Sequence, residues 1–78
     1  MLNNFSQFVM DLYDIYSGIT VSASSDNLTI NLGENEEILL WFVGEKVFPE
    51  IVHDFEYNHA IDLEMVMEIL RLVEKYTQ

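Results

Sequence analysis

The fold of this chain is decided by residues 19–43, which read ITVSASSDNLTINLGENEEILLWFV. Apolar residues alternate with Thr, Ser and Asn in 19–23 and again in 28–32, and this period of two predicts half-buried strands. The polar residues 24–27 between them favour a turn, because short polar side chains hydrogen-bond to nearby backbone groups. An antiparallel hairpin is therefore expected.

A third strand is predicted from the apolar run that follows. A second polar turn at 33–36 leads into residues 38–43, all of them apolar, and Gly44 ends the run. Periodicity by itself leaves a short helix open at this position, since a continuous apolar run suits either structure. With the hairpin, the run predicts a three-stranded antiparallel sheet.

Three segments have the apolar spacing of helices. In 4–17 the apolar residues recur every three or four positions, and Gly18 suits the left-handed conformation that closes a helix. Pro49 is favoured at the first position of a helix, and the apolar spacing that follows predicts a short helix over 49–57. The last helix is expected over 61–76, because its acidic residues lie early and its basic residues late, which complements the helix dipole.

The predicted order of elements is α-β-β-β-α-α, which defines an α+β domain with its helices on one face of a small sheet. The 78 residues allow a single small domain, 1–78, and they contain no cysteine for a disulfide or a thiolate metal site. The N-terminus lacks the basic residues of a secretory signal, and no apolar run is long enough to cross a bilayer. A cytoplasmic protein is expected.

Negative charge is concentrated in the middle of the chain. The sequence has 14 Asp and Glu against 3 Lys and Arg, for a net charge of −11. Residues 34–64 carry nine of those acids and one lysine, whereas 65–78 is balanced. This charge excludes direct binding of nucleic acid or of an anionic membrane, because the protein would repel phosphate groups. The partner that it favours is a basic protein.

An acidic segment of this kind predicts a non-catalytic inhibitor that acts as a DNA mimic and occupies the basic nucleic-acid-binding surface of a partner, such as a nuclease complex. Carboxylates several ångströms apart can replace a row of phosphates in contacts with Lys and Arg. In size and charge the chain resembles the small acidic inhibitors that phages use against host nucleases, including anti-CRISPR and uracil-DNA-glycosylase inhibitor proteins, and it resembles bacterial nuclease-immunity proteins. The alternative is a solvated surface that only keeps the protein soluble. The predicted contact residues are Glu34, Glu36, Glu37, Glu45, Glu50, Asp54 and Glu56.

The third predicted strand is apolar on both faces, which is typical of a strand that is covered on both sides. The helix predicted over 49–57 is one candidate for the second cover. A partner or a second copy of the chain is the other, and the last helix, whose apolar surface is wider than one stripe, would join that interface. In this reading the chain is a homodimeric structural or adaptor domain whose charge serves only solubility. The predicted dimer contacts are Leu39, Trp41 and Val43.

Neither catalysis nor a metal site is expected. Glu50, His53, Glu56 and His59 repeat every three residues, and one Glu-x-x-His pair resembles half of a carboxylate–histidine metal site. On a helix, steps of three rotate such a row by about −60° each, so the four side chains diverge. The two histidines lie outside any recognisable Ser-His-Asp arrangement, and there is no Gly-rich phosphate loop. We therefore expect no enzyme, no cofactor and no catalytic residue.

Overall fold

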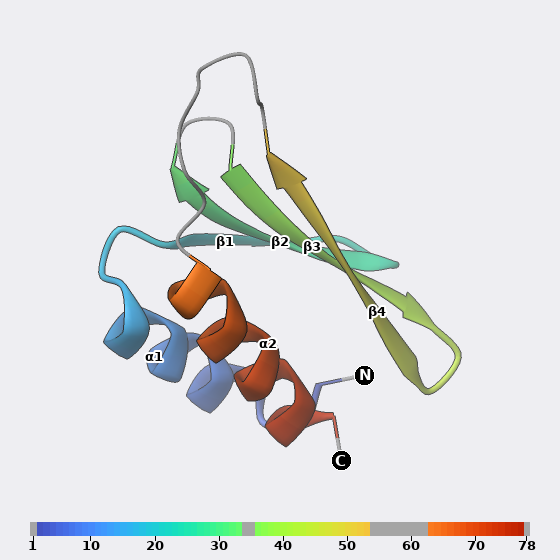
Figure 1. Ribbon diagram of the computed structural model, residues 1–78. Helices are drawn as coiled ribbons and strands as arrows, with labels where there is room; N and C mark the ends of the chain where they lie inside the picture. The colour runs from blue at the N-terminus through green and yellow to red at the C-terminus, as the bar shows by residue number, and fades with distance from the viewer. Residues whose placement is uncertain (1, 34–35, 54–62, 78) are drawn as a thin grey trace.

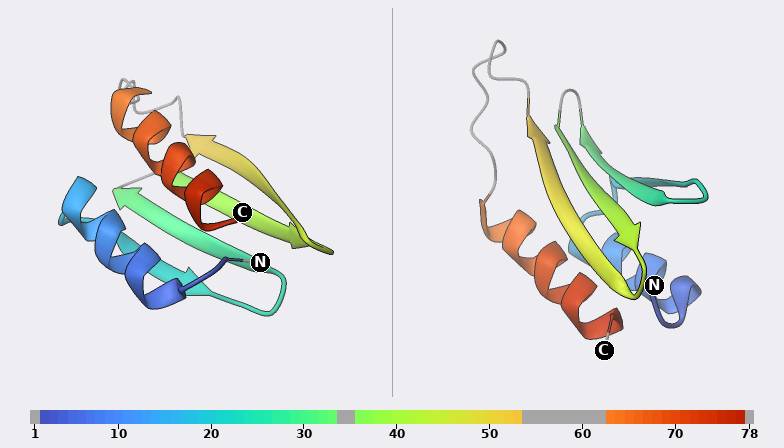
Figure 2. Two further views of the ribbon diagram at one scale, coloured as in Figure 1. Left: turned by 90° about the horizontal axis from the view of Figure 1, so that it is seen from below. Right: turned by 90° about the vertical axis from the view of Figure 1, so that its right-hand side faces the viewer.

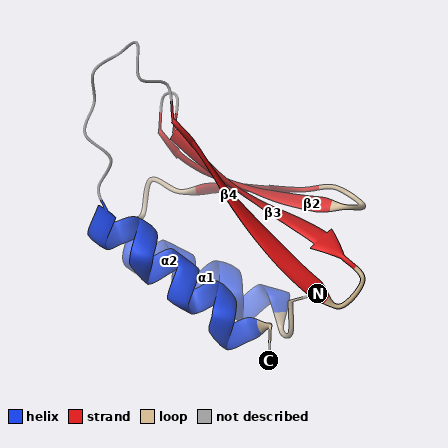
Figure 3. Cartoon of the chain, turned by 45° about the vertical axis from the view of Figure 1, so that its right-hand side comes forward, coloured by secondary structure: helices blue, strands red, loops and turns tan. Residues whose placement is uncertain are grey.

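The computed structural model describes residues 2–33, 36–53 and 63–77. Within them the chain forms an α+β fold of four antiparallel strands and two helices (Figure 1). The elements are, in chain order, α1 (Phe5–Ile15), β1 (Thr20–Ala23), β2 (Asn27–Gly33), β3 (Glu36–Val43), β4 (Lys46–His53) and α2 (Leu63–Tyr76). Each strand pairs with its sequence neighbour, and both helices lie on one face of the sheet (Figure 3). The predicted α+β class is confirmed, but the sheet has four strands where three were predicted.

The first two strands form the hairpin that their alternating residues predict. They pair antiparallel, with Val21 opposite Ile30. In the turn, the Ser24 N–H donates to the Asn27 carbonyl at 2.9 Å, and the Asn27 side-chain amide donates to the Asp26 carboxylate at 3.2 Å. Short polar side chains thus hold the turn through local hydrogen bonds, as expected for such residues.

The helix predicted over 49–57 is wrong for the residues that the structure describes, because Lys46–His53 form the edge strand β4. β4 pairs with β3 along its whole length, from Val43 opposite Lys46 to Glu36 opposite His53. The apolar residues of this segment lie on both faces of the strand and do not form one stripe of a helix. Residues 54–57 of the predicted helix lie outside the described part of the chain.

A two-residue turn, Gly44-Glu45, joins β3 to β4. Gly44 has a φ of 63°, at the first turn position, where a type II′ hairpin turn favours glycine. Counted from this turn, hydrogen-bonded and non-hydrogen-bonded pairs alternate, so Leu40 and Pro49 form a non-hydrogen-bonded pair. The nitrogen of Pro49 then points away from β3, where the missing N–H costs no bond within the sheet. A proline is therefore tolerated here in an edge strand.

The C-terminal end of α1 differs from the predicted helix. At the start of α1, the Asn4 side chain accepts a hydrogen bond from the Gln7 N–H at 3.4 Å, as is typical of an N-cap asparagine. The helix ends at Ile15, and Tyr16 adopts extended backbone with a φ of −155°. Gly18 does not take the left-handed conformation that was predicted for it. Instead it makes room for the Tyr16 ring, which would lie 2.5 Å from a Cβ added at Gly18.

The core lies between the helices and the sheet. The helices run antiparallel and side by side (Figure 2), so that the Asn3 N–H donates to the Tyr76 carbonyl at 2.7 Å. The Tyr76 ring meets the Phe8 ring edge-on at 5.7 Å. Among the described residues, those that are buried are all hydrophobic: Phe8, Leu12, Ile19, Leu28, Ile30, Leu32, Ile38, Leu40, Val66, Ile69, Val73 and Tyr76. Among the described residues, neither helix has the length and apolar character needed to cross a membrane.

Candidate functional site

The face of the sheet that points away from α1 and α2 has no described element packed on it, and we call it the open face (Figures 1 and 3). Strand alternation decides which side chains lie there. Ile38 and Leu40 of β3 are buried beneath the helices, so their neighbours Leu39 and Trp41 lie on the open face. From β3 and β4 the open face receives Glu37, Leu39, Trp41, Val43, Lys46, Phe48, Glu50 and Val52.

Five apolar side chains gather on this face, and we call them the open-face patch: Leu39, Trp41, Val43, Phe48 and Val52. Trp41 and Phe48 are directly opposite each other across the two strands and are 37% and 49% exposed. Val43 and Val52 lie near the two ends of the patch and are 61% and 39% exposed. The β1–β2 half of the same face carries Thr, Ser and Asn instead. Exposed apolar surface that includes aromatic residues is typical of protein-binding sites.

Two carboxylates border the open-face patch at one end. Glu50 is opposite Leu39, and Glu37 is opposite Val52, so the two glutamates are diagonal neighbours about 7–8 Å apart at Cα. The indole N–H of Trp41 donates to Oε2 of Glu50 at 3.0 Å, which holds that carboxylate beside the aromatic ring. The face is therefore apolar in its middle and anionic at this end.

The remaining acidic residues predicted as a contact surface are not all on the open face. Glu36 lies at a β3 position of the opposite alternation, and Glu45 lies in the turn between β3 and β4. The strand from Glu37 to that turn spans about 20 Å, at about 3.3 Å per residue. The structure thus brings Glu37 and Glu50 together and separates them from Glu45. The other three predicted contacts lie outside the described residues: Glu34, Asp54 and Glu56.

The predicted dimer contacts, Leu39, Trp41 and Val43, all lie on the open face. The described part of the segment that was expected to cover them as a helix belongs to β4, which pairs beside β3 and widens the sheet. α2 packs against the other face of the sheet. Its exposed apolar residues, Leu63 and Met67, therefore belong to the layer of helices and not to the open face. One flat interface therefore cannot include both the third strand and the last helix, as the dimer hypothesis supposed.

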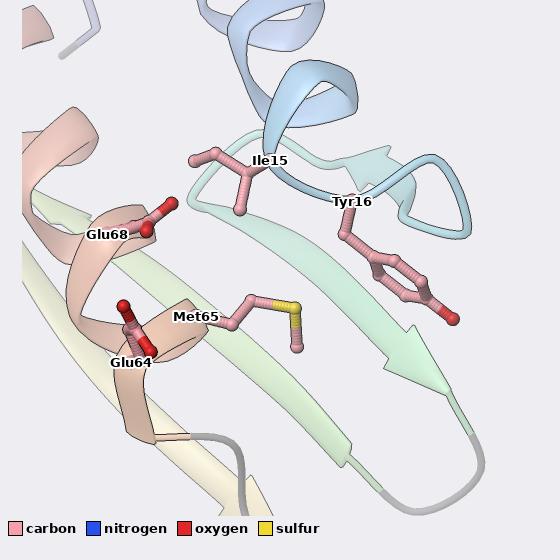
Figure 4. A pocket seen from close by; sticks show the side chains of 5 residues that line it. All are labelled: Ile15, Tyr16, Glu64, Met65 and Glu68. Atoms are coloured by element: carbon pink, nitrogen blue, oxygen red, sulfur yellow. The ribbon is translucent and has the colours of Figure 1, made fainter.

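Two pockets lie away from the open face. The first, of about 260 Å³, is between the end of α1 and the start of α2, where Met65 extends toward Tyr16 and Glu64 and Glu68 form one wall (Figure 4). The second, of about 250 Å³, lies beside the start of α1 and is lined by Leu2, Phe5, Ala23, Ser24, Ser25, Leu28 and Phe42. Neither described lining pairs a nucleophile with a base.

The Glu-x-x-His row is not helical in the part that the structure describes. Glu50 and His53 both lie in β4, where a spacing of three places residues at positions of opposite alternation. Glu56 and His59 lie outside the described residues. Among the residues described, no group of three or more His, Cys, Asp and Glu side chains could hold a metal ion.

Phe48 and Val52 were not predicted as surface residues, because their spacing was interpreted as that of a helix. A period-two pattern was present: Lys46, Phe48, Glu50 and Val52 share one face of β4. As a strand, this stretch predicts that Phe48 and Val52 extend the apolar surface of the third strand.

The chain matches no protein-family model, no curated protein and no solved structure.

Proposed function

We propose that this chain is a non-catalytic protein-binding domain whose open face occupies a basic surface of a partner protein, of the kind that holds nucleic acid. The observation that carries the proposal is the open-face patch with Glu37 and Glu50 at its border, on a face that no described element covers. The partner's Lys and Arg side chains would bind these carboxylates in place of phosphates, and the nucleic acid would be displaced by competition.

The two parts of the surface have different roles in this function. Burial of apolar side chains supplies affinity, at about 25 cal/mol per Å² removed from water. The net charge of −11 speeds the encounter with a basic partner, and this effect weakens as salt screens the field. Glu37 and Glu50 then select the orientation in which basic side chains of the partner face them.

The test is affinity capture from a native lysate at low and at physiological salt, followed by competition with nucleic acid. The variant Glu37→Lys/Glu50→Lys should lose the captured partner, with a Kd at least about tenfold weaker. The matched control, Glu64→Lys/Glu74→Lys, makes the same change in net charge on exposed positions of α2 and should retain the partner. The proposed competition would be excluded if both variants lost the partner equally. It would also be excluded if neither salt nor added nucleic acid changed the binding of the partner.

A homodimer is the second candidate, and the position of Lys46 favours it. Lys46 lies at one end of the open face, and Glu37 and Glu50 lie toward the other. Two copies packed face to face with their strands antiparallel would bring Lys46 of one copy toward the carboxylates of its partner. The repulsion between two chains of net charge −11 opposes this pairing. Sedimentation equilibrium decides: Trp41→Glu should dissociate such a dimer, and a wild-type monomer at high protein concentration would exclude it.

A further inference from the structure

A hydrogen bond joins Trp41 and Glu50 on the open face. The two residues are diagonal neighbours, since Trp41 is opposite Phe48 and Glu50 is opposite Leu39. The bond from the indole N–H, at 3.0 Å, uses one acceptor site of the carboxylate and leaves its other lone pairs for a ligand. An aromatic face and an oriented carboxylate are thus presented side by side at the surface.

Among the described residues, no lysine or arginine is placed to neutralise this site. Only three Lys and Arg residues are present, and Arg71 and Lys75 belong to α2, on the other side of the sheet. Lys46 is four residues from Glu50 along β4, about 13 Å at Cα. Glu37 adds a second negative charge on the diagonal from Glu50. The open-face patch, together with Glu50 and Glu37 at its border, is therefore complementary to a ligand that carries a positive charge and an apolar surface.

The guanidinium group of arginine meets these requirements better than the ammonium group of lysine. It is planar and stacks on an indole, where a cation–π contact stabilises the complex. Its fixed fork of donors pairs with a carboxylate that lies beside the ring, whereas lysine acts as a compact and strongly hydrated charge. The apolar neighbours Leu39 and Phe48 keep water from one side of the contact and so strengthen it.

The edge of β4 is a poor place for the same partner to bind. Positions 47, 49, 51 and 53 direct their backbone groups away from β3, and Pro49 removes the N–H in the middle of that row. A strand added at this edge would lose a hydrogen bond and meet the proline ring. Recognition through side chains on the open face is consequently favoured over addition of a strand.

We infer that the open-face patch binds an arginine of the partner protein, with its guanidinium group stacked on the Trp41 indole and paired with Glu50. This inference rests on the proposed function and specifies its central contact. Glu37 binds a second basic side chain or strengthens the field at the first. Phe48 and Val43 then contact the apolar residues that flank the arginine.

The experiment uses the single tryptophan of the chain as the reporter, because its fluorescence and its indole N–H resonance come from the site itself. The probe is an acetylated and amidated peptide, Leu-Arg-Leu-Arg-Leu, titrated to about 10 mM. Matched peptides replace both arginines with lysine or with the uncharged isostere citrulline. We expect the arginine peptide to bind at least about threefold more tightly than the lysine peptide and about tenfold more tightly than the citrulline peptide.

Two variants tie this binding to the proposed pair. Glu50→Gln keeps an acceptor for the indole N–H and removes the charge, so it should weaken the arginine peptide by about tenfold and abolish its advantage over citrulline. Trp41→Leu, followed by the backbone amide resonances of β3, should abolish the preference for arginine over lysine. Glu64→Gln on α2 is the control, and it should change neither the affinity for the arginine peptide nor the preference for arginine over lysine. Dispersed amide spectra establish that each variant is folded.

The outcomes separate the two proposals. Equal affinity for the arginine and lysine peptides, with both lost in Glu50→Gln, overturns the arginine inference and leaves a basic partner on the open face. Binding that survives both variants, or no change in the spectra up to 10 mM peptide, also overturns the inference. In those cases the capture experiment with Glu37→Lys/Glu50→Lys still judges the proposed function independently. A wild-type dimer that Trp41→Leu dissociates and arginine peptide leaves intact assigns the face to a second copy and overturns the inference.

Discussion

At the scale of single residues, one polar contact connects the two helices. The Tyr76 O–H donates to Asp11, which also accepts a hydrogen bond from the Gln7 side chain at 2.9 Å. Donation by Tyr76, then by Gln7, lowers the pKa of Asp11 below its ordinary value of 3.8, and the nearby Lys75 acts in the same direction. The bond to Asp11 raises the pKa of Tyr76 above 10.0, because the phenol holds its proton against a neighbouring carboxylate. The contact is thus formed by ionised Asp11 and neutral Tyr76.

The direction of these pKa shifts predicts how stability depends on pH. A carboxyl group with a lowered pKa in the folded state stabilises the fold above pH 3.8, and this stability is lost as the pH falls through the folded pKa. A phenol with a raised pKa stabilises the fold below pH 10.0, and that stability is lost as the pH rises through its folded pKa. The contact therefore contributes fully between these limits.

Tyr76→Phe should lower the Tm at pH 7, since it keeps the ring against Phe8 and removes the hydroxyl. The difference from wild type should narrow as the pH falls from about 3.8 through the lowered pKa of Asp11 in the folded protein, because the carboxylate that accepts the bond then becomes protonated. Thermal melts between pH 2.5 and 7, read by circular dichroism, measure it. Tyr13→Phe, at a 45% exposed tyrosine of α1, is the control and should not change the Tm. A difference between Tyr76→Phe and wild type that stays constant with pH would contradict the assignment.

At the scale of elements, the edge strand β4 combines exposed apolar side chains with a proline in its middle. Phe48, Ile51 and Val52 are between 39% and 49% exposed, so the strand has the composition of an aggregation-prone edge. Pro49 interrupts the row of outward N–H groups that a second strand would need. We interpret the proline as the feature that keeps this edge from pairing with another copy.

Pro49→Thr should therefore increase self-association. Threonine restores the outward N–H and favours the strand conformation, so we expect an association constant at least about tenfold higher, or about 1.4 kcal/mol. Sedimentation velocity over a range of protein concentrations measures this change. Ile51→Thr is the matched control, because Ile51 has the same alternation in β4 and already carries an N–H. If Pro49→Thr sediments as the wild type does, the proline does not protect the edge.

At the scale of the whole molecule, the excess of negative charge opposes the folded state. The net charge of −11 is confined to a chain with a radius of gyration of 12.2 Å. Unfolding separates these charges, so their mutual repulsion destabilises the compact fold, and salt reduces that repulsion.

The Tm at pH 7 should consequently rise as NaCl increases from about 10 to 300 mM. For a domain of this size, about 1 kcal/mol of relieved repulsion corresponds to about 4–8 °C in Tm. The control variant Glu64→Lys/Glu74→Lys, four charge units less negative, should show a smaller rise. Differential scanning calorimetry at constant pH provides the measurement. A Tm that falls with salt, or that rises equally in the variant, would show that repulsion does not limit the stability of the wild type.

Local pattern was sufficient for much of the fold. Alternation over 19–32 predicted the hairpin that β1 and β2 form, and apolar spacing predicted the two helices within a few residues of their ends. The run 38–43 predicted most of β3. These features depend on side chains a few positions apart, which share one face of an element whatever the rest of the chain does. The candidate residues on the third strand, Leu39, Trp41 and Val43, could be chosen from the sequence for the same reason.

Local pattern is enough to predict the α+β class, the two helices and the first hairpin, because each element has a single period of apolar residues. The assignment of 46–53 to a strand depends instead on tertiary pairing, since Phe48, Ile51 and Val52 suit either a helical stripe or a strand apolar on both faces. Pairing with β3 selects the strand, and it thereby leaves one face of the sheet open. The neighbourhood of Trp41, Phe48, Glu50 and Glu37 exists only through that register, because cross-strand contacts are set by pairing and not by spacing along the chain.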